Sequence, residues 1–193
     1  MTSVAAIEAA VAEPAEGQSA ELVARARAGD RAALEALIVS VERRVYALAW
    51  RLVGDRAAAE DVAQEVFLKI CRRLDRFRGG NFLGWVYRMV VNQAHDWRRR
   101  AGPAAEELGE VGAPPGFDAA REEQLRRVTD AMRVLSPKER EALVMTDMEG
   151  FTSGEAARIL GCMAITVRVR AAQARKKLRR VLARHYPELR EGV

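Results

Sequence analysis

The side chains best suited to bind a partner are cations, and they gather in two segments of the chain. Between Ala156 and Pro187 there are nine Lys or Arg residues and no Asp or Glu. Arg and Lys neutralise phosphates, and Arg can also bond the two acceptors of a guanine edge. This segment is typical of a nucleic-acid-binding surface, although a solvated basic helix face would have the same composition.

The second basic segment, from Lys69 to Arg100, mixes cations with aromatic rings. It holds nine Lys or Arg residues against two acidic ones. The interleaved aromatic residues are Phe77, Phe82, Trp85, Tyr87 and Trp97. Rings beside cations suit single-stranded nucleic acid, because bases stack on the rings while the cations neutralise the backbone. For Phe82 and Trp85 a place in the core explains the residue types equally well, and we expect Trp97 to pack against a neighbouring helix.

A third candidate surface is acidic and precedes the second basic segment. On a helix, Asp61, Gln64, Glu65 and Lys69 share a polar face opposite an apolar stripe. An acidic face on a basic chain should point away from nucleic acid. It suits a protein partner, or it is ordinary surface.

Residues that could transform a substrate are scarce. The chain has two histidines, His95 and His185, and lacks a Gly-rich phosphate loop, a Ser/His/Asp set and a metal-ligand pattern. We interpret His95 as a surface or DNA-proximal side chain. Cys71 and Cys162 stand far apart, outside any CxxC or Cys/His cluster, which favours two structural thiols in a reducing cytoplasm. We therefore expect neither enzyme activity nor a cofactor.

The composition favours helices that would position these side chains. Hydrophobic residues make up 49% of the chain and charged residues 31%, with only 6% aromatics. The net charge of +5 and the pI near 9.7 suggest an anionic partner. No apolar run approaches the roughly 20 residues that span a bilayer, and 1–19 lacks the basic residue of a signal peptide. We expect a cytoplasmic protein without membrane insertion.

The first predicted domain spans residues 20–100 and is helical. Apolar residues spaced by threes and fours predict a helix of about six turns before Gly54, with Asp55 capping the next helix. Asn81 is expected to open a third helix after a glycine pair. Residues 1–19 have the composition of a disordered acidic tail.

The second predicted domain, 123–186, follows a Gly- and Pro-rich acidic linker at 101–122 and precedes a tail at 187–193. Two capping boxes, 136–139 and 152–155, open helices that we expect to end at Gly150 and Gly161. A long basic helix follows from about Ala164. A short helix, a tight turn and a long helix form a helix-turn-helix. The predicted fold is all-α: two small helical domains joined by a flexible linker, the second a helix-turn-helix.

These motifs resemble two regions of the extracytoplasmic-function (ECF) RNA polymerase sigma factors. The run ending in Glu-Asp-Val-Ala-Gln-Glu-Val-Phe at Phe67, together with 74–88, resembles region two. Residues 135–182 resemble region four. The resemblance implies a bacterial transcription initiation factor that binds core RNA polymerase and directs it to promoters.

The resemblance also implies a role for each candidate surface. The acidic face would bind the clamp helices of the polymerase β′ subunit through Asp61, Gln64, Glu65, Phe67 and Lys69. The mixed segment would capture an unstacked base of the minus-ten element through Arg76, Phe77, Arg78, Asn81, Phe82, Trp85, Arg88, Asn92, Arg98 and Arg99. The last helix would read the minus-thirty-five element as duplex through Thr166, Arg168, Arg170, Gln173, Arg175, Lys176 and Lys177. The β flap of the polymerase and an anti-sigma factor are further implied partners.

The last helix departs from the family pattern. Met163 stands where relatives often have a capping Ser, while Ala172 and Gln173 stand where larger and basic residues are common. The resemblance places position 173 in the groove, and Gln suits adenine, so we predict Gln173 as a base reader, with Arg168 or Arg175 on phosphates.

One alternative remains at the level of sequence. A stand-alone helix-turn-helix regulator would explain 135–182 but leaves the first domain without a purpose. Such a regulator would bind promoter DNA by itself, whereas a sigma factor needs core polymerase.

Overall fold

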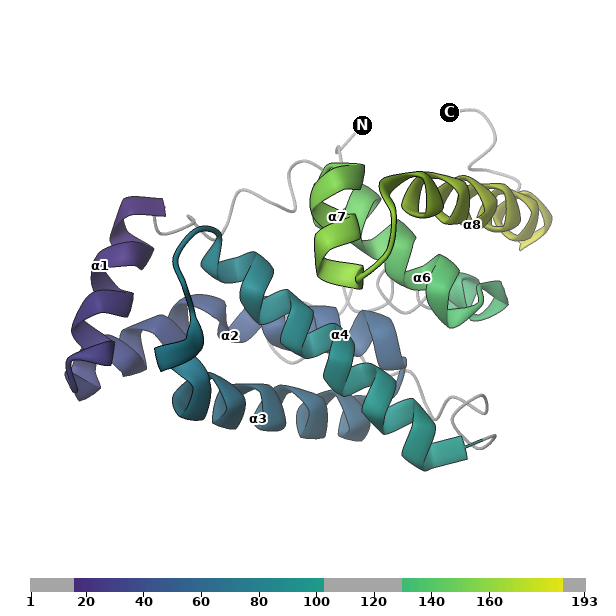
Figure 1. The fold of residues 1–193 in the computed structure, drawn as a ribbon. Coiled ribbons are helices and arrows are strands. Elements are labelled where there is room, and N and C mark those ends of the chain that lie inside the picture. The colour runs from purple at the N-terminus through teal and green to yellow at the C-terminus, as the bar shows by residue number, and fades with distance from the viewer. Residues whose placement is uncertain (1–15, 103–129, 186–193) are drawn as a thin grey trace, which may run out of the picture.

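The computed structural model describes residues 16–102 and 130–185, and every regular element in these two stretches is helical (Figure 1). The predicted all-α class is confirmed. The first stretch contains α1 (Glu16–Arg27), α2 (Arg31–Val53), α3 (Arg56–Arg73), the short 3-10 turn η2 (Leu74–Arg76) and α4 (Phe82–Ala101). The second contains the 3-10 turn η4 (Met132–Val134), α6 (Pro137–Leu143), the π-helical turn η5 (Val144–Met148), α7 (Ser153–Leu160) and α8 (Ala164–His185).

The helix ends of the first stretch follow the predicted local signals. Gly54 ends α2 in the left-handed region, with φ 73°, where a residue without Cβ is favoured. The Asp55 side chain then accepts a 2.7 Å hydrogen bond from the Ala58 N–H at the start of α3. Asn81 caps α4 in the same way. These turns let α2, α3 and α4 pack on one another, with α1 against α2 (Figure 1).

The second stretch is organised by its two capping boxes. Ser136 and Thr152 each accept from the backbone N–H three residues on, where Glu139 and Glu155 reach back to the cap. Both predicted boxes are confirmed. Helices α6 and α7 then pack against α8.

Two predicted boundaries differ from the structure. Helix α1 begins at Glu16, inside the segment predicted as a tail. The α-helix opened by Ser136 ends at Leu143, and a π-helical turn continues it to Met148, still short of Gly150. Most of the predicted 101–122 linker and all of the 187–193 tail lie outside the described residues.

The two stretches share one hydrophobic core. A single cluster of buried side chains includes residues from α2, α3 and α4 together with residues from α6, η5 and α8. Helix α4 contacts α7, and α2 contacts both α6 and η5. The predicted domains therefore lie against each other in this structure. Within the described residues, no helix has the length and apolar character needed to cross a bilayer.

Candidate nucleic-acid interfaces

The acidic face of α3 borders a groove. Asp61, Gln64 and Glu65 are exposed and line one wall of a space of about 410 Å³ between α3 and α4. The α4 wall includes Trp97 and Arg100, which the sequence did not place beside the acidic face. The structure thus joins an acidic helix surface to an aromatic ring and a cation in one concave site.

Two residues predicted on this face instead have side chains that are half-buried. Phe67 is half-buried and packs against the core. Lys69 is also half-buried, and its ammonium donates a hydrogen bond to Oε1 of the buried Gln93 on α4. Lys69 therefore joins α3 to α4, and Phe67 packs on the core; their predicted contact with polymerase stays a prediction.

The loop before α4 is shaped by two glycines and one cap. Gly79 and Gly80 have φ of 89° and 87°, values that side chains with a Cβ rarely adopt. Asn81 follows in extended backbone, and its Oδ1 accepts a 2.8 Å hydrogen bond from the Gly84 N–H. Asn81 therefore orients the first turn of α4, while Arg76 and Arg78 are exposed beside it.

The aromatic residues near this loop form a cluster. The ring centroids of Phe77, Phe82 and Trp85 lie 5.4–5.8 Å apart. Phe77 and Phe82 are each only 5% exposed, whereas Trp85 is half-buried. Phe77 and Phe82 are therefore core residues in this structure, and their rings pack against the Trp85 ring.

An arginine that sequence reasoning missed anchors the same loop. Arg27, in the last turn of α1, donates to the carbonyl of Asp75 at 3.1 Å and to that of Phe77 at 3.4 Å. Together with Arg76 and Arg78, these residues line a cavity of about 640 Å³. No local pattern identifies Arg27, because its partners lie 48 and 50 residues away.

The cations predicted along α4 differ in their surroundings. Arg88 and Asn92 are exposed. Arg99 is exposed too and pairs with Asp96 of its own helix at 2.9 Å. Arg98 is directed away from solvent, because its Nη2 donates at 2.6 Å to Glu141 of α6. In this structure Arg98, which was predicted to contact DNA, is thus paired with an acid of the same chain.

The helix-turn-helix is formed by α7, a turn at Gly161 with φ 64°, and α8. Four of the predicted α8 residues are exposed, namely Arg168, Gln173, Arg175 and Lys176, and three are half-buried, namely Thr166, Arg170 and Lys177. Arg175 pairs with Asp147 at 2.8 Å, and Lys177 pairs with Glu139 at 2.7 Å. Of the predicted set, Arg168, Gln173 and Lys176 therefore have the most accessible positions.

Comparison with known proteins identifies the family. The Sigma-70 region 2 model matches residues 37–103, and the Sigma-70, region 4 model matches 125–178. The chain is 34% identical over 176 residues to the ECF RNA polymerase sigma factor SigE of Mycolicibacterium smegmatis, covering 86% of this chain and 68% of that one. This chain belongs to the ECF RNA polymerase sigma factors. A stand-alone helix-turn-helix regulator does not account for the region 2 match.

Further relatives agree in sequence and fold. The sigma factor is 30% identical to the RNA polymerase sigma-H factor of Pseudomonas aeruginosa, over 91% of this chain and 97% of that one. The solved structure of CnrH in complex with the cytosolic domain of CnrY is similar with a TM-score of 0.67 and 26% identity, over 85% of this chain and 96% of that chain. The sigma factor RpoE of Bartonella quintana, solved with the anti-sigma factor NepR, shares the fold with a TM-score of 0.66 and 24% identity, over 77% of this chain and 95% of that chain. Sigma factors direct RNA polymerase and are not enzymes, as the sequence predicted.

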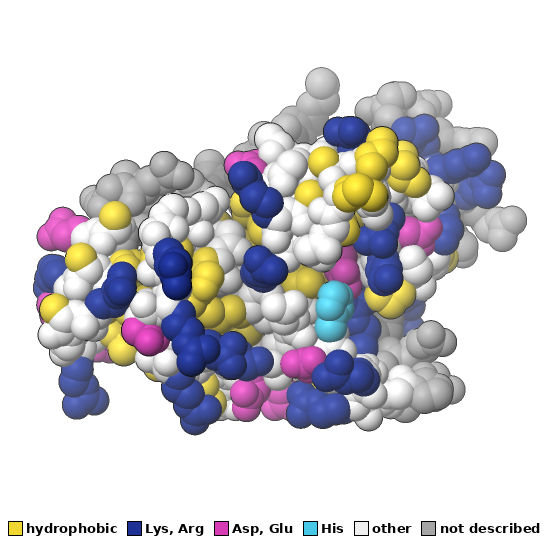
Figure 2. Space-filling view, viewed as in Figure 1, with side chains coloured by type: hydrophobic (Ala, Val, Ile, Leu, Met, Phe, Trp, Pro, Cys, Tyr) yellow, Lys and Arg dark blue, Asp and Glu magenta, His cyan; other side chains and the backbone are white. Residues whose placement is uncertain are grey.

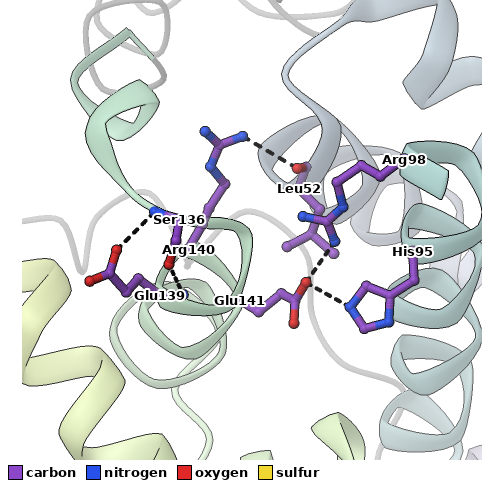
Figure 3. Close-up of polar contacts among 7 residues, drawn as sticks. All are labelled: Leu52, His95, Arg98, Ser136, Glu139, Arg140 and Glu141. Carbon is purple, nitrogen blue, oxygen red and sulfur yellow. Dashed lines mark hydrogen bonds and ion pairs between the residues drawn. The ribbon is translucent and has the colours of Figure 1, made fainter. Parts of the chain in front are cut away.

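Regions two and four of this sigma factor are held together by a buried acid (Figure 3). The Glu141 side chain is 4% exposed and receives Arg98 Nη2 at 2.6 Å and His95 Nε2 at 2.7 Å. Burial acts to raise the pKa of Glu141, but the His95 hydrogen bond and the Arg98 charge outweigh it and hold the pKa below its ordinary value. Glu141 is therefore a carboxylate that ties α6 to α4.

Arg140 forms a second connection next to Glu141 (Figure 3). Its guanidinium donates to the carbonyl of Leu52 on α2 at 3.4 Å and to that of Met132 at 3.1 Å. Burial, with the nearby Arg98 charge, lowers the pKa of Arg140 to about 10. The arginine thus stays protonated near neutral pH and bridges the two regions.

A third connection involves Glu149, which follows η5. Its carboxylate accepts from the Arg51 guanidinium and, at 2.5 Å, from the Tyr87 hydroxyl. Burial and the Glu149 charge raise the pKa of Tyr87 well above its ordinary value. The Tyr87 ring also meets Phe151 edge to face, with centroids 5.6 Å apart. The contact between the regions thus combines apolar packing with charge-assisted hydrogen bonds.

Proposed function

We propose that this sigma factor recognises the minus-ten element as an unstacked single strand through region two and the minus-thirty-five element as duplex through region four. The observation that carries the proposal is the helix-turn-helix of α7 and α8, whose second helix exposes Arg168, Gln173 and Lys176 after a left-handed glycine turn. The second helix of such a motif lies in a major groove, where Arg and Lys reach phosphates and guanine, and Gln reaches adenine.

Region two offers a separate site for a single strand. Arg76, Arg78 and Arg27 surround the cavity beside the loop, and the half-buried ring of Trp85 lies on the aromatic cluster next to it. Cations beside an aromatic platform suit an unstacked strand, whose backbone needs neutralising and whose bases stack on rings. We assign the minus-ten contact to this loop and to the exposed Arg88, Asn92 and Arg99 of α4.

We assign the clamp helices of the β′ subunit to the groove between α3 and α4. An acidic wall formed by Asp61, Gln64 and Glu65 suits a basic helical partner, and the Trp97 ring in the same groove supplies an apolar anchor. Region four would contact the β flap. We also propose an anti-sigma partner, as reported by name for RpoE, which shares the fold, and a cytoplasmic location.

Charge reversal tests the polymerase contact. The double variant Asp61→Arg/Glu65→Arg should lose co-purification with core polymerase, because like charges placed against a basic partner cost several kcal/mol. The matched control is Glu35→Arg/Glu42→Arg, which makes the same charge change at exposed positions of α2. Retention of core polymerase by the first variant, or equal loss by both, would refute the assignment.

Run-off transcription tests the function as a whole. Purified core polymerase should initiate at a promoter of this factor only when the wild-type chain is added. Binding of promoter DNA by the chain alone, with no effect of core polymerase on promoter choice, would contradict the proposal.

A further inference from the structure

We propose that Ile165 and Val169 of α8 read the methyl groups of thymines in the minus-thirty-five duplex. This role rests on the proposed function of α8 and adds two apolar residues to the polar side chains assigned there. Both belong to a group of apolar side chains exposed to solvent at the end of α8 that should meet the bases.

Exposed apolar side chains are concentrated at this one place. Six large hydrophobic residues are exposed in the described part of the chain, and three of them fall within seven residues: Met163 at 70%, Ile165 at 52% and Val169 at 48%. Figure 2 shows hydrophobic side chains gathered at the start of α8 with Lys and Arg side chains close by. A helix that only needed a solvated basic face would have no reason to expose this group.

The geometry of the motif points this group toward base edges. In a helix-turn-helix, the N-terminal residues of the second helix contact the bases. Within 164–169 the exposed side chains are Ile165, Arg168 and Val169. At about 100° per residue, Ile165, Val169 and Ala172 fall within about 60° of one another. The buried residues of α8, Val167, Ala171 and Ala174, lie on the opposite side of the helix.

The charges around these exposed apolar side chains indicate which kind of partner they contact. The chain has no acidic residue from 156 to 187, and Arg168 and Lys176 are exposed beside the apolar side chains. A purely apolar partner would leave these cations without counter-charges. A major groove offers both features, because thymine presents a C5-methyl group there and the phosphates lie alongside.

The sharpest test removes only the methyl group from the DNA. Holoenzyme first selects its preferred minus-thirty-five sequence from promoter duplexes randomised at that element. Each thymine of the selected element is then replaced, one at a time, by deoxyuridine. For the wild type we expect about a fourfold loss of holoenzyme affinity at one or two thymines, the change produced by uncovering one methyl-sized group.

The variants should lose this response. Val169→Ala or Ile165→Ala holoenzyme should bind the thymine and deoxyuridine duplexes alike at the position that its side chain reads. Both side chains are about half exposed, so the substitutions leave the core intact. Val39→Ala is the matched control, since Val39 is an exposed valine on α2, 63% exposed, and should keep the wild-type response.

Other outcomes separate this inference from the function on which it rests. If holoenzyme selects a preferred element but its affinity is unchanged by every deoxyuridine substitution, the proposed contact with thymine methyl groups is wrong. The proposed role of α8 in binding the element would then still stand. Failure to select any preferred element would overturn both. If the alanine variants instead lose core polymerase while keeping the deoxyuridine response, the patch is a protein contact and the inference is wrong.

Discussion

At the residue scale, Asn81 has one role that the structure shows and one that we propose. Asn81 was predicted both to open α4 and to meet an unstacked base, and the structure shows the first role directly, through its bond to the Gly84 N–H. An alanine at this position would remove the cap and the amide together. A loss of promoter opening by that variant would not say which role mattered.

A serine substitution separates the two roles of Asn81. Ser is as good an N-cap as Asn, whereas Ala at such a position costs about 1 kcal/mol of stability. We expect Asn81→Ser to keep the free energy of unfolding while reducing open-complex formation on duplex promoters, and Asn81→Ala to reduce both. Urea denaturation and permanganate footprinting with holoenzyme measure the two effects. Normal promoter opening by Asn81→Ser would limit Asn81 to capping.

At the element scale, helix ends were readable from the sequence because their causes are local. Asp55, Asn81, Ser136 and Thr152 each bond a backbone N–H three residues on, so residue type and spacing suffice to identify them. The contacts of Arg27 were not readable, because each joins segments about fifty residues apart. The burial of Phe77 and Phe82 was ambiguous for a related reason: an aromatic residue beside cations suits either a base or a core.

The turn between α7 and α8 gives an element-scale prediction. Gly161 has φ 64°, and a Cβ added there would meet no atom within 4 Å, so Gly161→Ala carries backbone strain alone. The left-handed conformation costs a residue with a Cβ roughly 1–2 kcal/mol. We expect Gly161→Ala to lower the free energy of unfolding by that amount. We also expect weaker binding of the minus-thirty-five element, because the orientation of α8 relative to α7 would change.

A second glycine provides the control for Gly161. Gly154 lies in α7, where an added Cβ would also meet open space but where no positive φ is required. Gly154→Ala should therefore be neutral or slightly stabilising, since alanine is the better helix former. Equal destabilisation by the two substitutions would show that the turn conformation of Gly161 is not the cause.

At the scale of the whole molecule, the packing of region four on region two conflicts with the proposed binding of both promoter elements at once. The two elements are centred roughly 25 base pairs apart. Because a duplex rises 3.4 Å per base pair, they lie about 85 Å apart. Helix α4, which contacts region four, has 20 residues and is about 30 Å long. The 27 residues of 103–129 can span at most about 90 Å when fully extended, which is enough to join separated regions.

The two regions must therefore separate for the proposed function. Separation costs free energy, because it breaks the hydrogen bonds of the acids at the contact between them. Glu141 and Glu149 together accept from His95, Arg98, Arg51 and Tyr87 of region two. A hydrogen bond to a charged group contributes about 1.5–3 kcal/mol. Separation would also release Arg98 for the minus-ten contact that the family resemblance implies.

Removing both acids should shift the molecule toward the separated arrangement. We expect Glu141→Ala/Glu149→Ala to increase the radius of gyration measured by X-ray scattering. With excess core polymerase, the variant should also have a lower apparent dissociation constant for a promoter that carries both elements, because less of the chain remains in the packed arrangement, which cannot bind both at once. Asp147→Ala is the control, since Asp147 pairs with Arg175 inside region four. Because the pKa of Glu141 lies below its usual 4.5, wild-type compaction should hold from pH 8 to pH 5 and weaken only as the carboxylate is protonated below about pH 4.5. Unchanged dimensions and unchanged promoter affinity in the Glu141→Ala/Glu149→Ala variant would show that these acids do not hold the two regions together.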